Sequence, residues 1–197
     1  MAVSSSPPKN SFVAFVRKIY NPIGFAKGYN FVLWFILVGA LLGFTLARFQ
    51  YVDFYGRFCT PGGDGGAAPG ECFDFLRIRR YTVGMILHLV TILPGSLLAC
   101  LQFVPVIRHK AVMFHRINGY AVLLLSLVSM AGVYMVLPAS FGGSIETRAV
   151  GGALGISFIV SLVLAYINIK RMQIEQHRAW MLRAWVYVRK PTYYNLP

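Results

Sequence analysis

The sequence predicts an all-α integral membrane protein: a bundle of four membrane-spanning helices with both termini in the cytosol. Hydrophobic residues make up 57% of its 197 residues, and the mean hydropathy is +0.61. A soluble domain of this length would be less apolar. Four apolar stretches, each long enough to cross about 30 Å of hydrocarbon as a helix, occupy residues 29–49, 81–104, 117–137 and 149–169.

The distribution of charge sets the expected orientation. The formal net charge is +13. Both terminal segments and the loop between the second and third spans are rich in Lys and Arg, whereas the other two loops balance basic with acidic residues. Because cytosolic loops carry the excess of Lys and Arg, both termini are predicted to be cytosolic. The charges lie beside apolar spans, so we expect anionic lipid head groups as their partners and no nucleic acid.

The two terminal segments are predicted to be cytosolic tails, one of residues 1–28 and a basic one of residues 170–197. In the first, apolar residues at helical spacing oppose Arg17 and Lys18. This pattern is typical of an amphipathic helix that lies in the head-group layer, and a plain juxtamembrane linker is the alternative. The apolar residues are Phe12, Phe15, Val16, Ile19 and Tyr20.

Two cysteines enclose a Gly- and Pro-rich part of the first non-cytosolic loop. Cys59 and Cys72 can form a disulfide if this loop faces an oxidising compartment. Closing a loop of this size would stabilise the fold by about 3 kcal/mol. Two free thiols are the alternative. Cys100 lies inside the second span, where no partner is expected.

Three histidines lie where they could carry chemistry. His88 lies in the non-cytosolic half of the second span, where it either binds a ligand or bridges two helices. His115 lies at the cytosolic entry to the third span and His177 just after the fourth, and each is followed by an arginine, Arg116 and Arg178. We expect His115 and His177 to approach each other at similar membrane depth.

Two interpretations of this pair remain open. Neutral imidazoles on facing helices can hold a haem b iron axially, which makes His115 and His177 the candidate ligands. Alternatively, the histidines and arginines cap helices and contact lipid phosphates, because Arg forms planar bidentate bonds with phosphate. No carboxylate or cysteine is expected to join the pair at the same membrane depth, so a metal site is not predicted. We find no catalytic motif, and we predict neither catalytic residues nor an enzyme.

The motif order resembles a known family. The chain has a histidine in one span, the motif HRINGY at the start of the next, and HRAWMLRAW after another. This order resembles that of the predicted membrane proteins grouped as domain of unknown function 2306, over about residues 81–186. The resemblance implies a topology and a context, not a mechanism: members occur in bacteria and filamentous fungi, some beside secondary-metabolite genes. Members continue into a further apolar helix, so this fungal-type chain is expected to be shortened at its C-terminus. The matching positions are His88, His115, Arg116, Gly119, His177, Arg178, Trp180, Met181 and Arg183.

These features together predict a multi-pass protein of an endomembrane or the plasma membrane. We expect a non-enzymatic accessory protein that handles a lipophilic small molecule in a fungal secondary-metabolite pathway. Its expected partners are the lipid bilayer and that small molecule. One alternative is a haem-binding oxidoreductase. The other is a structural partner of another membrane protein, because small residues at four-residue spacing favour close helix packing. These pairs are Gly39 with Gly43 and Gly151 with Gly155.

Overall fold

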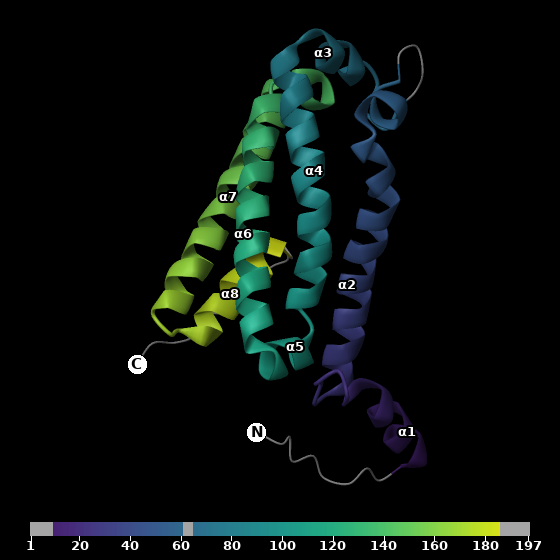
Figure 1. Ribbon diagram of the computed structural model, residues 1–197, viewed down its shortest axis with the longest axis vertical. Helices are drawn as coiled ribbons and strands as arrows, with labels where there is room; N and C mark the ends of the chain where they lie inside the picture. Colours follow the sequence, from purple (N-terminus) through teal and green to yellow (C-terminus); the bar gives the residue numbers. More distant parts are fainter. Residues whose placement is uncertain (1–9, 61–64, 186–197) are drawn as a thin grey trace.

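The computed structural model describes residues 10–60 and 65–185, and within these ranges it contains helices and no strand (Figure 1). Four helical segments of the described chain are long and apolar enough to cross a membrane. The predicted all-α, multi-pass membrane architecture is therefore confirmed. The segments are α2 (Gly28–Arg48) with η1 (Phe49–Val52), α4 (Arg79–Gln102), α6 (Val112–Val136) and α7 (Ile145–Lys170).

Successive spans run in opposite directions, which gives the bundle two distinct ends (Figure 1). One end, called the basic end below, gathers α1 (Ser11–Tyr20), α5 (Pro105–Lys110) and the start of α8 (Ile174–Trp185). The other, called the capped end, gathers η2 (Phe54–Phe58), α3 (Glu71–Arg77) and η3 (Ser140–Gly143). The basic end holds the segments that the charge distribution assigns to the cytosol.

The closest pairing of spans is between α4 and α6, and two glycines allow it. A Cβ added to Gly132 would lie 2.5 Å from the carbonyl oxygen of Gly84, and one added to Gly84 would lie 2.6 Å from the Cβ of Met135. Small residues let the backbones of two membrane helices approach in this way. Of the small-residue pairs that the sequence singled out, Gly39 and Gly43 have nothing within 4 Å of an added Cβ. The other predicted pair does pack closely: a Cβ added to Gly151 would lie 2.7 Å from Cδ1 of Leu137, and one added to Gly155 would lie 2.7 Å from the Tyr134 hydroxyl.

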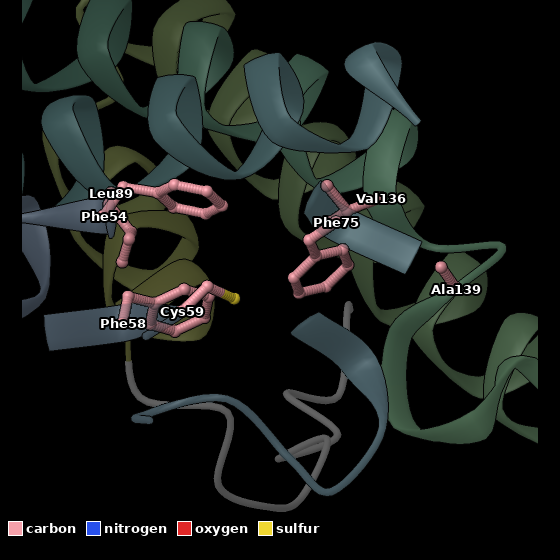
Figure 2. Close-up of a cluster of buried hydrophobic side chains, with 7 residues drawn as sticks. All are labelled: Phe54, Phe58, Cys59, Phe75, Leu89, Val136 and Ala139. Atoms are coloured by element: carbon pink, nitrogen blue, oxygen red, sulfur yellow. The ribbon is translucent and has the colours of Figure 1, made fainter. Parts of the chain in front are cut away.

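The capped end has its own hydrophobic core, in which aromatic rings from η2 and α3 cover the ends of α4 and α6 (Figure 2). A disulfide joins Cys59 to Cys72, with an S–S distance of 2.03 Å. The Glu71 carboxylate is buried and accepts hydrogen bonds from the backbone N–H groups of Ala68 (2.8 Å) and Phe141 (2.6 Å). It thereby ties the loop before α3 to the turn between α6 and α7. The core residues are Phe54, Phe58, Cys59, Phe75, Leu89, Val136 and Ala139.

The N-terminal segment forms the helix α1, which displays the amphipathic pattern of the sequence. Phe12 and Phe15 are 76% and 63% exposed, so this helix has an apolar face that the rest of the described chain leaves uncovered. At its end, the ring of Tyr20 stacks on Phe31 of α2. The connection to α2 is fixed to α5 by a hydrogen bond from the Val106 N–H to the Ile23 carbonyl (2.9 Å).

The orientation can be tested with the two loop cysteines. We expect a membrane-impermeant thiol reagent to label Cys59 and Cys72 only from the non-cytosolic side, and only after reduction, because the Lys/Arg bias places the capped end there. Mass spectrometry of sealed vesicles of known sidedness would measure this. Cys100, which is buried in α4, is an internal control that stays unlabelled in the folded protein. Labelling of the loop cysteines from the cytosolic side would reverse the assigned orientation.

Candidate binding site at the basic end

Within the basic segment of residues 170–197, the chain forms the helix α8, which turns back along α7. The chain reverses at Met172, whose φ is +60°. Beyond the turn, the His177 imidazole bonds to the Ala165 carbonyl (2.9 Å), and the Trp185 ring packs edge-on against Phe158. The segment is rich in charge, but its aromatic residues find an apolar surface on α7. The part of the predicted tail from residue 186 onward lies outside the described residues.

The bond to Ala165 fixes the state of the His177 ring. A carbonyl oxygen only accepts hydrogen bonds, so Nδ1 of His177 carries the proton and donates it. In the neutral imidazole, Nε2 is then left with a lone pair. The ring can accept a hydrogen bond or bind a metal through Nε2 while its orientation is held by α7.

His115 lies in the first turn of α6, where two amides tie α6 to the end of α4. The Gln102 side chain donates to the His115 carbonyl (3.1 Å), and the Asn118 side chain donates to the Leu98 carbonyl (2.9 Å). Nδ1 of His115 is buried and has no hydrogen-bond partner within the described chain. The ring is therefore placed at the junction of two helices with one polar atom unsatisfied.

The two His-Arg motifs meet at this end of the bundle. His177 and Arg108 both lie close enough to His115 to interact with it electrostatically. Arg108, on α5, also interacts with Arg178 and Glu175 of α8. We call these five residues the basic cluster. The cluster joins the adjoining helices α5 and α6 to α8, which lies much further along the chain. His115, His177 and Arg178 were the members that the sequence indicated.

The basic cluster carries more positive than negative charge. Glu175 is the only acidic residue at this end among the residues that the structure describes, and its carboxylate already accepts two bonds from Arg178 (2.9 and 3.1 Å). Burial lowers the pKa of the Arg108 guanidinium, and the neighbouring charge of Arg178 lowers it further, whereas Glu175 raises it. Arg108 is thus half-buried beside a like charge, an arrangement that an anion would relieve.

Sequence reasoning missed Arg108 because it counted that residue only as a charge in a loop. The signal that could have found it is Pro105, which occupies the first turn of α5. Proline is favoured at the start of a helix, so it predicts that the loop folds as one. That helix holds Arg108 against the bundle instead of leaving it in solvent.

The other two predicted binding residues lie apart from these contacts. Nδ1 of His88, on α4, is 2.8 Å from the Ser129 hydroxyl of α6, so His88 links the two closest helices. Its position is toward the capped end of α4. Arg116 follows His115 on α6 and is exposed. Within the described residues, no group of three or more His, Cys, Asp or Glu side chains could hold a metal ion.

Comparison with known proteins identifies the family. The model for "Predicted membrane protein (DUF2306)" matches residues 85–190, more than half of the chain. The chain belongs to this family. The resemblance that HRINGY and HRAWMLRAW indicated is therefore confirmed, and the part that the family shares contains His88 and the whole basic cluster. The family match begins beyond α1, α2 and α3.

Curated proteins give a more distant similarity. The chain is 30% identical over 92 residues to NADH-quinone oxidoreductase subunit J of Escherichia coli strain K12, and equally to that of Shigella flexneri. These matches cover 46% of this chain and 47% of each relative, so the chain spans about half the length of the curated relatives it matches. No solved structure matches.

Proposed function

We propose that this family member is a binding protein of the membrane that holds the anionic head group of a lipophilic small molecule at its basic end. The observation that carries the proposal is the basic cluster, in which the Glu175 carboxylate is bonded to Arg178 while the half-buried Arg108 lies near both of them. Arginine binds carboxylate and phosphate groups through paired, charge-assisted hydrogen bonds. A bound anion would offset the excess positive charge and use the donors of Arg108.

The surroundings of the basic cluster suit the apolar part of such a molecule. The first turns of α6 expose Met113 (68%), Phe114 (46%) and Ile117 (63%), next to His115. An acyl chain or polyketide-like tail would contact these side chains while its head group meets the arginines. The family resemblance adds a product of fungal secondary metabolism to the ligands worth testing, beside ordinary membrane lipids.

Exchanging Arg108 for glutamine tests this proposal. The purified protein in nanodiscs should bind a fluorescent fatty acid, 11-dansylamino-undecanoic acid, and R108Q should bind it roughly tenfold more weakly, the loss expected for one hydrogen bond to a charged group. Titration of dansyl fluorescence measures this. The matched control is R80Q, which removes one arginine at the opposite end of the bundle and should leave the affinity unchanged. Equal affinity of R108Q and the unaltered protein would reject the proposal.

Haem binding is a second candidate function, favoured by the tautomer of His177. A histidine that donates Nδ1–H to a backbone carbonyl presents Nε2 to a metal, and the bound haem would supply redox chemistry. His177 and His115 would hold the haem iron. A protein expressed with ample haem should then show a Soret band that H115A and H177A each abolish. The absence of that band from the unaltered protein would eliminate this function.

Association with another membrane protein is the third candidate, favoured by α2. In the span that includes α2, only 6% of the apolar stretch is buried inside the protein, whereas 44% of the apolar stretch of α4 is buried. The curated relatives are by name subunits of an oxidoreductase. A partner that covers α2 would add the packing that this helix lacks in the chain alone. Cross-linking in native membranes from a photoreactive residue placed at Gly39 would detect it, and label confined to lipid would count against it.

A further inference from the structure

The helix α8 lies at the depth of the membrane spans, not in the water beyond them. Its last residue, Trp185, packs on Phe158, which is 12 residues before the end of α7 at Lys170. At 1.5 Å per residue this corresponds to about 18 Å along the helix, close to the middle of a bilayer. Figure 1 shows α8 rising beside α7 and behind α6 to about mid-height. The second half of α8, which contains Arg183, is therefore carried into the leaflet at the basic end.

One of these residues, Arg183, is exposed and stacked on an aromatic ring. Its guanidinium carbon lies 4.3 Å from the centre of the Trp180 ring, one turn earlier in α8. Side chains on a helix point toward its N-terminus, so Arg183 extends back toward the basic end. The arrangement holds a planar cation over an aromatic face, with one side open for a further partner.

No carboxylate of the described chain lies at this depth. The acidic residues other than Glu175 are at the capped end, on the opposite side of the bundle, and Glu175 is bound to Arg178. A cation within hydrocarbon is costly unless a counter-charge accompanies it. An acidic molecule of the leaflet would supply this negative charge. The described acidic residues at the capped end are Asp53, Glu71, Asp74 and Glu146.

We propose that Arg183 and Trp180 form a second binding position, inside the leaflet at the basic end, for the anionic head group of an amphiphile. The inference rests on the proposed function and deepens it, because it defines the ligand as an acidic amphiphile that enters sideways from the bilayer. Arg183 and Trp180 receive the head group first, and the basic cluster at the start of α8 receives it next. A carboxylate and a phosphate share the required chemistry, and Trp180 packs against the first part of the chain.

Spin-label electron paramagnetic resonance measures this preference directly. The full chain is placed in phosphatidylcholine vesicles with a trace of spin-labelled stearic acid, phosphatidic acid or phosphatidylcholine, and the protein-bound fraction of each label is compared. The unaltered protein should select the anionic labels, and R183Q should lose about tenfold of that selectivity, the effect of one hydrogen bond to a charged group. R183K keeps the positive charge and should retain most of the selectivity for anionic labels. R171Q, the matched control in the turn before α8, should behave as the unaltered protein.

The outcomes separate the ligand sources and the two proposals. Selectivity for stearic acid alone identifies a free acid, and selectivity for phosphatidic acid alone identifies a phospholipid; each supports the inference when R183Q removes it. If folded R183Q selects anions as strongly as R171Q does, the position within the leaflet is rejected. The function proposed above would survive that result if R108Q still weakened binding, and both proposals fall if neither variant has an effect. Near-ultraviolet circular dichroism checks that each variant is folded.

Discussion

Replacing Gly132 with valine is expected to lower the free energy of unfolding by roughly 3–5 kcal/mol, because the side chain would overlap the backbone of α4. An added Cβ already lies 2.5 Å from the Gly84 carbonyl oxygen and 2.8 Å from the backbone nitrogen of His88. Backbone atoms cannot move aside as a flexible side chain can. The two helices would have to separate, and the bond from Ser129 to His88 would be lost with them.

Unfolding of the purified protein by sodium dodecyl sulfate, followed by circular dichroism, measures this effect. The matched control is Gly39→Val on α2, where nothing lies within 4 Å of an added Cβ. That control should unfold at nearly the same detergent fraction as the unaltered protein. If Gly132→Val and Gly39→Val are equally stable, the close pairing of α4 and α6 is wrong.

Replacing Glu71 with alanine is expected to have the second large effect, at the capped end. The buried carboxylate accepts from two backbone donors, Ala68 and Phe141, and its loss leaves both without a partner. Both hydrogen bonds are partly buried, and each lost hydrogen bond to a charged group costs about 1–3 kcal/mol, so the expected loss is roughly 2–6 kcal/mol. Glu71→Gln keeps one oxygen as an acceptor and should fall between alanine and the unaltered protein.

Hydrogen exchange, read by mass spectrometry, gives the most local test of this effect. In Glu71→Ala, the amides of the loop before α3 and of η3 should exchange faster, while those of α7 near the basic end should not change. Glu146→Ala is the control, because Glu146 is an exposed carboxylate at the start of α7. Unchanged exchange around Phe141 in Glu71→Ala would show that the carboxylate does not tie the cap together.

The spans could be predicted from the sequence because apolar length alone determines whether a helix crosses a bilayer. The contacts between helices could not be predicted from the sequence in the same way. Of the two glycine pairs with the spacing typical of a helix contact, Gly151 and Gly155 pack against residues of α6 and its end, whereas Gly39 and Gly43 contact nothing. The closest backbone approach is made by Gly84 and Gly132, which the spacing did not indicate. Four-residue spacing is a property of one helix, whereas packing depends on which face of a second helix lies opposite. A single sequence does not contain that relation.

The candidate site also has a part that the sequence predicted and a part that it did not. The repeated His-Arg pattern indicated His115 and His177, because a polar motif at a span end is conspicuous in an apolar chain. Arg108 and the direction of α8 escaped notice for a common reason: both depend on how charged segments fold outside the apolar runs. The charges of residues 170–197 indicated a basic segment but not the packing of Trp185 on Phe158, which sets the direction of α8.

The central claim is that an acidic amphiphile binds where α5, α6 and α8 meet, and photolabelling with a fatty acid tests it most directly. A palmitic acid carrying a diazirine in its chain is incorporated into vesicles with the full chain, irradiated, and mapped by peptide mass spectrometry. We predict that label concentrates on α8 and the first turns of α6, and that excess unlabelled palmitate and R108Q each reduce it. Label spread evenly over all four spans, unaffected by competitor or by R108Q, would contradict the account.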